Sequence, residues 1–555
     1  MNRMKTGWYK NAVIYQIYPR SFCDSNGDGI GDLNGILSKI PYLKSLGIDA
    51  VWLSPCYASP NDDNGYDISD YREIMAEFGT MEDWKHMLHT LHENGIRLIM
   101  DLVVNHTSDE HRWFQESKKG RNNSYSDYYI WRDGIGPDKK TPPNRWGACF
   151  GGSAWEYCEE RGQFYLHLFS KKQPDLNWEN PDVRREVAEI CNFWLEKGVD
   201  GFRCDVITYI SKPDDLYHAP KSGVVVGPRW KEYIRELSAA SWDRYDSMIV
   251  GEAAEIDWHR AMEITDDREH LLDTLFHFEH VAPLPVCRYS QNTTDLRRFK
   301  KILFRWQALP EHCWPSVYYE NHDQPRSIPR FAPSGSLREQ SAKSLAASLL
   351  FQKGTAFLYQ GQELGMTNAP FREEDYRDIR AVNQIREARR KPLARWTMPF
   401  VLRYLRRYSR DHARTPMQWD GTQNAGFTTG TPWIMVNPNY PQINAREQQG
   451  REDSVFHFYQ KALKVRKDYL ELIRDGEFIP IDALNRNVMA YARRLGRRTL
   501  LVLCSLSPRK STVRLEGDYV GNSAALVIGN SEDVPVLERR TVLQPCQCAV
   551  FFLEK

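Results

Sequence analysis

Carboxylate side chains follow a series of short apolar runs in this chain, and this arrangement is where chemistry would be expected. Asp205 ends the run GFRCD, Glu252 follows MIVG, and Asp323 stands in ENHDQPR. A single acid at such a position is usually a helix cap or part of a structural ion pair. Two histidines and an arginine stand at equivalent places: His106, His322 and Arg203. Polar groups that recur at successive strand ends predict a converging active site.

Converging carboxylates suit the cleavage of a glycosidic bond. One ionised acid attacks or stabilises the anomeric carbon, and one protonated acid serves the leaving oxygen. Arg203 lies two residues before Asp205, on the same face of a strand, so its charge is expected to lower the pKa of that carboxyl. Partial desolvation after the apolar run would keep Glu252 protonated near neutral pH. Glu255, three residues further on, is the alternative acid.

The elements that must position these groups are eight short apolar runs, each followed by a longer segment with helical spacing. The runs begin at Ala12, Asp49, Arg97, Asp200, Ser247, Leu272, Ser316 and Ala356. Strands that alternate with helices predict an α/β fold with a parallel (β/α)₈ barrel, whose chemistry sits at the carboxyl ends of the strands.

Two regions interrupt this rhythm and divide the chain. Residues 107–172 are rich in Gly, Asn, Trp and Tyr and are too long for a simple loop, which predicts an inserted subdomain after the third strand. Residues 476–555 contain short β-rich runs between turn residues, which predicts a C-terminal antiparallel β-sandwich. The barrel would then comprise residues 1–106 and 173–475.

The segments DLVVNH, GFRCDV, IVGEAAE and ENHDQPR resemble the four signature regions of the α-amylase family, glycoside hydrolase family 13. The resemblance covers essentially the whole chain, including the insertion and the C-terminal region. It implies that Asp205 is the nucleophile, Glu252 the general acid/base and Asp323 the stabiliser of the transition state. It also implies that Arg203 orients the nucleophile and keeps it ionised.

The same resemblance extends to the groups that would hold the terminal sugar. It implies that His106 and His322 hydrogen-bond this sugar in the innermost subsite. The segment NDDNGYDISDY implies that Tyr66 stacks on the sugar ring and that Asp67 bonds its far hydroxyls. Arg414, in ARTPMQWD, would pair with Asp67 and close the pocket behind the sugar.

A pocket closed at one end predicts an exo-acting enzyme that removes one terminal glucose. Phe150 and Phe169 are expected either to line this pocket or to belong to the core of the insertion. The segment QPDLN (Gln173–Asn177) and Val206, directly after the nucleophile, resemble the α-1,6-acting subgroup of oligo-1,6-glucosidases. The expected substrates are therefore isomaltose, isomalto-oligosaccharides and panose.

Four other functions remain open on the sequence. Three are enzymes of the same family: a trehalose-6-phosphate hydrolase, a sucrose isomerase and an α-1,4-glucosidase. The fourth belongs to another class, the non-catalytic barrels of transporter-associated chains. Those carry a membrane span and tend to lack the catalytic acids, whereas the acids are present here.

The segment DSNGDGIGD sets oxygen donors at alternating positions, with a glycine at the sixth. The expected donors for a structural Ca²⁺ or Mg²⁺ are Asp24, Asn26, Asp28, the carbonyl of Ile30, and Asp32. The twelfth position is Gly35 rather than the Glu of an EF-hand. A loop of Asx-turns without a metal is the alternative.

The composition limits the partners. Lys and Arg number 74 against 73 Asp and Glu, so the net charge of +1 gives no field that would attract nucleic acid or an anionic membrane. No apolar run approaches the ~18 residues of a membrane span. The expected partner is a small oligosaccharide, and the expected state is a monomer or a weak homo-oligomer. Eleven cysteines without zinc-type CxxC pairs or an export signal predict reduced thiols and a cytoplasmic location.

Two basic segments are expected to be structural. The stretch from Ile385 to Arg410 is better explained as a solvated helical face than as a site for a phosphorylated sugar. The cluster RRLGRR, Arg493–Arg498, predicts a hairpin turn.

Overall fold

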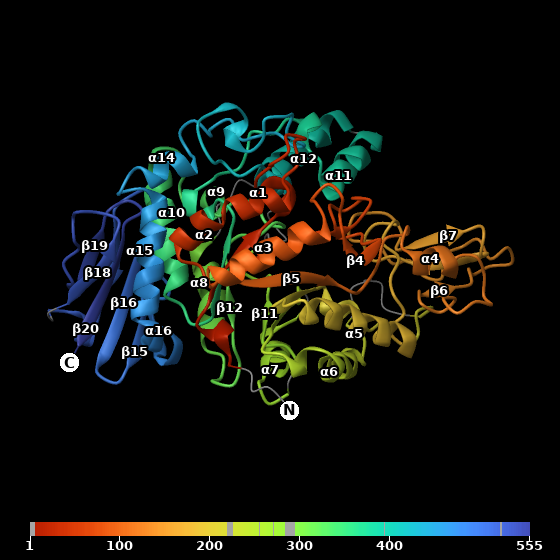
Figure 1. The fold of residues 1–555 in the computed structure, drawn as a ribbon. Helices are drawn as coiled ribbons and strands as arrows, with labels where there is room; N and C mark the ends of the chain where they lie inside the picture. Colours follow the sequence, from red (N-terminus) through yellow and green to blue (C-terminus); the bar gives the residue numbers. More distant parts are fainter. Residues whose placement is uncertain are drawn as a thin grey trace.

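The architecture comes from a computed structural model (Figure 1). It describes residues 6–218, 226–254, 256–269, 271–282, 295–392, 394–521 and 524–554. Glu255, the alternative acid, and Cys287 lie outside the described residues.

Eight parallel strands form the central sheet, in the order β11-β10-β9-β5-β2-β1-β13-β12. They are β1 (Val13–Ile17), β2 (Ala50–Leu53), β5 (Arg97–Val103), β9 (Gly201–Asp205), β10 (Met248–Glu252), β11 (Thr274–Phe276), β12 (Ser316–Val317) and β13 (Thr355–Tyr359). Each of the eight predicted apolar runs contributes one strand. The (β/α)₈ barrel is therefore confirmed.

The strands are short and apolar because they are buried on both faces. Aromatic rings from three strands meet inside the barrel: Phe276 lies 5.3 Å from Trp52 and 4.6 Å from Phe357, between ring centroids. The barrel interior is thus a packed core, and room for a substrate remains only at its ends.

The strands at the two ends of this order, β11 and β12, are joined through side chains. Three hydroxyl groups donate to main-chain carbonyls across this seam: Thr274 to Trp314 (2.7 Å), Ser316 to Leu275 (2.5 Å) and Tyr318 to His277 (2.7 Å). These bonds satisfy buried carbonyl groups at the seam.

Helices follow the strands and surround the barrel (Figure 1). They include α1 (Leu33–Ser38), α2 (Ile40–Leu46), α3 (Met81–Glu93), α5 (Pro181–Glu196), α6 (Trp230–Ala240), α7 (Trp258–Thr265), α8 (Leu296–Gln307), α10 (Arg338–Leu350) and α15 (Val455–Asp468). Their starts follow local rules. In α3, for example, Thr80 and Asp83 bond each other's backbone N–H groups in a capping box.

The insertion after β5 lies at one side of the barrel (Figure 1). It contains α4 (Arg112–Ser117) and an antiparallel sheet of β6 (Trp131–Arg132), β8 (Gln163–Leu166) and β7 (Trp155–Cys158). Trp146, Trp155 and Phe164 share an apolar cluster that also takes in Val206 from the end of β9. The insertion therefore packs directly behind the residue that follows Asp205.

At the opposite side of the barrel lies an antiparallel C-terminal region (Figure 1). Its main sheet contains, in order, β14 (Glu477–Ile481), β15 (Val488–Leu495), β16 (Arg498–Ser505), β20 (Cys548–Glu554) and β18 (Ala525–Gly529). A second sheet pairs β17 (Ser511–Arg514) with β19 (Arg540–Leu543), and apolar side chains fill the space between the sheets. Gly496 and Arg497 form the tight turn between β15 and β16, so the predicted hairpin is confirmed.

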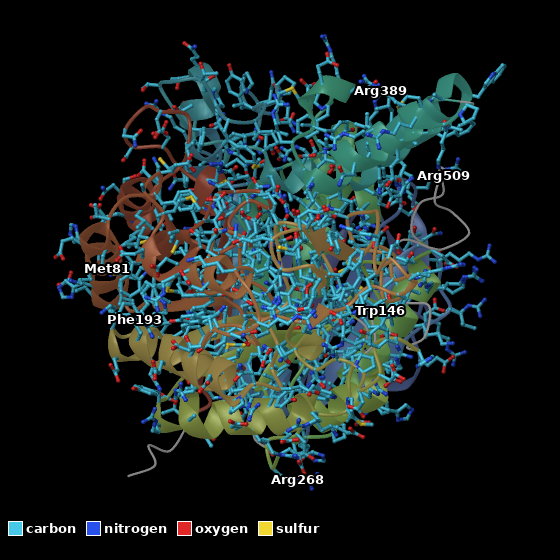
Figure 2. All side chains as sticks on the ribbon, turned by 90° about the vertical axis from the view of Figure 1, so that its right-hand side faces the viewer. Met81, Trp146, Phe193, Arg268, Arg389 and Arg509 are labelled. Atoms are coloured by element: carbon cyan, nitrogen blue, oxygen red, sulfur yellow. The ribbon has the colours of Figure 1, made fainter. Side chains whose placement is uncertain are left out.

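The basic stretch forms much of α11 (Ile379–Arg390) and α12 (Ala394–Tyr408), next to the carboxyl end of the barrel. Arg389 lies at the outer edge of the molecule (Figure 2), as a solvated face requires. Arg410, at the end of the stretch, is different: its side chain is largely buried, and the prediction of a solvated face is wrong for this residue.

No helix in the described part of the chain combines the length and the apolar character needed to cross a membrane. Every cysteine in that part is a free thiol.

Candidate active site

A buried guanidinium group stands at the centre of the site. Arg203 and Asp205 project from the same face of β9, and Arg203 is 2% exposed. One terminal nitrogen of Arg203 lies 2.7 Å from Asp101 Oδ1 and 2.6 Å from Asp205 Oδ1, and the other contacts Glu252 Oε2. The structure thus brings the ends of β5, β9 and β10 together around one cation.

The pKa values of the two central carboxyls are pushed apart. Burial raises the pKa of Asp205 to about 6, against the opposing charge of Arg203. Burial raises the pKa of Glu252 to about 8, again against Arg203 and with the help of the charge on Asp205. The two carboxyls also share a hydrogen bond. Glu252 therefore holds the proton that Asp205 has lost at neutral pH.

The expected effect of Arg203 on the pKa of Asp205 is present, but it does not set the net shift. Arg203 does act to lower the pKa of Asp205, as its position two residues earlier predicts. Burial outweighs it, and the net shift is upward. The alternation of side chains along a strand predicts that Arg203 and Asp205 meet. The extent of their burial determines whether the pKa of Asp205 rises or falls.

A second charge cluster surrounds Asp323. Its Oδ1 lies 3.1 Å from a terminal nitrogen of Arg410 and 3.0 Å from one of Arg414. Burial acts to raise the pKa of Asp323, but its interactions with His322 and the two arginines hold that pKa well below its usual range. Asp323 is therefore ionised throughout the physiological pH range.

Arg414 does not make the predicted pair with Asp67. Its two terminal nitrogens instead contact Asp323 and Asp378, each at 3.0 Å. Asp67 accepts two backbone N–H groups of its own loop, at 2.8 and 3.0 Å. These bonds stabilise the Asp67 carboxylate without a cation, so Arg414 is available to the acids on the other side of the pocket.

Three residues of this cluster were missed by sequence reasoning: Asp63, Asp378 and Arg410. Arg410 contacts Asp378 at 2.6 Å, Asp323 at 3.1 Å and Asp63 at 3.3 Å. Asp63 stands in the segment NDDNGYD, where the family resemblance indicated Asp67 and nothing in the spacing singled out Asp63. Asp378 caps α11 by accepting the N–H groups of its first turn, which is the usual reading of such an acid.

His322 is held in one orientation by a residue of β1 and a residue of the loop before β4 (Asp70–Ile74). The side-chain amide of Gln16, on β1, lies 2.7 Å from its Nδ1, and the hydroxyl of Tyr66 lies 2.7 Å from its Nε2. The Tyr66 hydroxyl also donates to Asp101 at 3.2 Å. Burial lowers the pKa of His322 to about 3, so the ring is neutral. Because the Gln16 amide donates to Nδ1, the single ring proton of His322 is on Nε2, where it faces Tyr66 and Asp323.

His106 is also buried and neutral, because burial lowers its pKa to about 4. Its Nε2 lies 3.1 Å from the carbonyl of Tyr66 and 3.2 Å from the side-chain amide of Gln173. Gln173 reaches Asp63 as well, at 3.3 Å. The predicted QPDLN segment therefore contributes to the wall of the site.

A cavity of about 320 Å³ opens on this constellation, and Glu252, Asp323, Phe150 and Phe169 are among its lining residues. The two phenyl rings lie 5.7 Å apart, and the guanidinium of Arg410 lies 5.1 Å from the Phe150 ring centroid. Of the two expectations for these phenylalanines, the structure supports the pocket wall. Phe169 additionally borders the apolar cluster of the insertion.

Val206 connects the site to the insertion. Its backbone has φ = 36°, in the left-handed region that a β-branched residue rarely adopts. Its side chain is 8% exposed and packs in the cluster of Trp146 and Trp155. This packing holds the strained turn that directly follows Asp205.

The predicted cation loop is folded as a series of Asx-turns. Asp24 accepts the N–H groups of Asn26, Gly27 and Gly29, and Asp32 caps α1. Among the described residues, no three His, Cys, Asp or Glu side chains form a group that could hold a metal ion. The groups expected to bind the cation offer only oxygen atoms.

Comparisons with known proteins agree with this geometry. A family model described as the α-amylase catalytic domain matches residues 16–476. An oligo-1,6-glucosidase from Parageobacillus thermoglucosidasius is 47% identical, with 99% of each chain covered. The crystal structure of a trehalose-6-phosphate hydrolase from Bacillus licheniformis superposes with a TM-score of 0.91 at 42% identity, over 99% of this chain and 100% of that one. An isomaltulose synthase from Erwinia rhapontici gives 0.93 at 39% identity, over 99% of both.

The family model matches most of this chain, and the relatives align with this chain over nearly their whole length. The chain therefore belongs to the α-amylase family, glycoside hydrolase family 13.

Proposed function

We propose that this protein is a retaining, exo-acting α-glucosidase that releases terminal glucose from short α-1,6-linked glucosides. The observation that carries the proposal is the pair Asp205–Glu252 around Arg203. One carboxyl is ionised and one is protonated at neutral pH, within hydrogen-bond reach of each other. A double displacement at an anomeric carbon requires this combination.

In the proposed reaction, Asp205 attacks the anomeric carbon while Glu252 gives its proton to the departing glycosidic oxygen. The covalent glucosyl ester on Asp205 is then hydrolysed by water, whose proton returns to Glu252. Arg203 orients Asp205 and offsets part of its charge. Two displacements restore the α configuration of the released glucose.

The second charge cluster would hold the sugar. Ionised Asp323 accepts hydrogen bonds from sugar hydroxyls, and the two arginines beside it fix its carboxylate and donate hydrogen bonds to other hydroxyls. His322, with its proton on Nε2, and His106 add neutral donors or acceptors, and Tyr66 supplies an aromatic face. Asp63, bonded to Arg410 and Gln173, is the additional acid that we assign to this pocket.

Linkage preference is proposed from the relatives and from Val206. Four relatives named oligo-1,6-glucosidases are 46–47% identical to this chain. Product analysis with isomaltose, maltose, sucrose, trehalose and trehalose 6-phosphate side by side tests the proposal. Glucose released fastest from isomaltose supports it; isomaltulose formed from sucrose, or a strict need for a phosphate, would assign the chain to another enzyme of the family.

Asp205→Ala is expected to reduce turnover by several orders of magnitude with the fold retained, because the attacking group is lost. Glucose first released by the unmodified enzyme should be the α-anomer, as measured by NMR before mutarotation. Early release of β-glucose would remove Asp205 from the role of nucleophile.

The pH profile follows from the two central carboxyls. Activity requires Asp205 ionised, so kcat/KM should rise as pH increases through about 6. It also requires Glu252 protonated, so kcat/KM should fall as pH increases through about 8. Rates from pH 4 to 10, with samples returned to pH 7 to verify stability, measure the profile. A rate that stays constant from pH 7 to 10 would exclude Glu252 as the proton donor.

Val206→Thr should raise the maltose-to-isomaltose ratio of kcat/KM about tenfold, or about 1.4 kcal/mol of differential transition-state binding. Thr is similar in size but adds a hydroxyl that can reach the aglycone or a bound water. The alternative is that Val206 has only a packing role, and its contacts with the insertion are consistent with such a role. If it only packs there, both substrates should lose activity in parallel and the ratio should not change.

We also propose that the loop Asp24–Asp32 binds a structural Ca²⁺ or Mg²⁺. Hydrogen bonds from Thr428 and from backbone N–H groups outweigh burial and lower the pKa of Asp24, so it is ionised. With Asp28 and Asp32 the loop carries three acids, and no Lys or Arg of the described chain pairs with them. Asn26 and the Ile30 carbonyl would complete the oxygen ligands.

Chelation is expected to lower Tm more than it lowers activity at room temperature, because an ion bound only by the folded state stabilises that state. Asp28→Ala should abolish this sensitivity. Differential scanning fluorimetry with and without chelator measures the change in Tm, and elemental analysis measures the bound ion. A protein without bound divalent ion and without a thermal response to Ca²⁺ or Mg²⁺ would refute the site.

The cytoplasmic location and the monomeric or weakly associated state remain predictions. The free thiols of the described cysteines are what a reducing compartment maintains.

A further inference from the structure

A large cavity lies at the end of the barrel opposite the active site. Its volume is about 910 Å³. It is lined by segments that precede three barrel strands, represented by Lys10 before β1, Trp314 before β12 and Lys353 before β13. The C-terminal region closes it with residues 474–478 and Arg493. The active site uses the carboxyl ends of the same strands, so the two sites are separated by the length of the barrel.

Two cations in this cavity have no acid partner in the part of the chain that the structure describes. Arg493 is 1% exposed, and its Nε has no hydrogen-bond partner there. It donates from one terminal nitrogen to the carbonyl of Gly476 and lies over the ring of Phe478. The ammonium group of Lys353 forms no ion pair with an acid of the described residues and lies 5.6 Å from the centroid of the Trp314 ring.

The position of Lys353 is fixed from behind. The side-chain amide of Gln307 bonds both the N–H and the carbonyl of Lys353, at 2.8 and 2.9 Å. Lys10 lies 5.7 Å from the same Trp314 ring, so two ammonium groups flank one indole. Unlike Lys353, Lys10 has an acid partner, Asp267, at 3.9 Å. Burial and the charges of Arg493 and Lys10 act to lower the pKa of Lys353, and together they outweigh the opposing charge of Glu311.

Acids are present in the cavity wall, but none of those described forms an ion pair with Lys353 or Arg493. Asp475 forms a two-bond pair with Arg474, which also contacts Asn11. Glu311 and Glu477 are exposed. The unpaired positive charge is therefore deeper than the negative charge, and a buried cation without a counter-ion costs free energy.

We propose that this cavity is a binding site for a phosphate-bearing small molecule, held by Lys353, Arg493 and Lys10. A guanidinium with free N–H groups and two ammonium groups matches the oxygens and charge of a phosphate group. The cavity exceeds the size of a free phosphate ion, and the aromatic and amide groups in its wall suit an attached sugar. Its location makes it independent of the glucosidase function proposed above.

Thermal stability provides the test. Tm is measured in inorganic phosphate, in glucose 6-phosphate and in glucose, with ionic strength matched by sodium chloride. Phosphate-bearing ligands should raise Tm by mass action, and a larger rise with the ester than with inorganic phosphate would identify the ester as the preferred source. Glucose reports on the active site at the other end of the barrel.

Lys353→Gln should weaken phosphate binding at least tenfold by isothermal titration and remove the Tm shift, while leaving the response to glucose unchanged. Lys464→Gln, an exposed lysine of α15 outside the cavity, is the matched control and should behave as the wild type. Lys10→Gln is the second variant if Lys353→Gln does not fold, with the same expected direction. Absence of a Tm shift in the wild type, or an equal shift in the cavity variants, would overturn the proposal.

Discussion

The rest of the active site depends on the burial of Arg203 among three carboxyl groups. A buried cation is tolerated only when nearby acids compensate it, and Asp101, Asp205 and Glu252 supply that compensation from three neighbouring strands. One positive charge cannot balance three negative ones in a site of this depth. Protonation of Glu252 reduces this excess from two negative charges to one. The assignment of acid and nucleophile is thus a consequence of charge balance around one guanidinium.

The second cluster follows the same principle, with two guanidinium groups among three carboxyl groups. Arg410 directly precedes the single turn α13 (Asp411–Arg414), and Arg414 ends it. The two residues lie four positions apart, so both guanidinium groups reach the same side. They meet Asp323, Asp378 and Asp63, which come from three distant parts of the chain. The pocket is complete only when the α11–α13 segment has docked on the barrel.

The inserted segment contributes through Val206. A β-branched residue with positive φ carries strain that only surrounding packing can maintain. That packing comes from Trp146 and Trp155 of the insertion. The turn after Asp205 is therefore supported by a segment that begins a hundred residues earlier in the chain, which explains why the insertion lies beside the site.

The sequence by itself determined the barrel and the place of its chemistry. Short apolar strands and amphipathic helices are local patterns, and acids at successive strand ends must converge once the strands are parallel. This pattern places Asp205, Glu252 and Asp323 among the converging groups, and the family resemblance supplies their roles. Only the tertiary structure decided the partners and the net charges. Arg414 forms an ion pair with Asp323 and not with Asp67, and Arg410 is largely buried although it ends a basic stretch. Both arginines bind acids that distant segments of the chain bring to this place. The pKa of Asp205 rises although an arginine is adjacent, because burial is a property of the whole fold and no spacing along a strand encodes it.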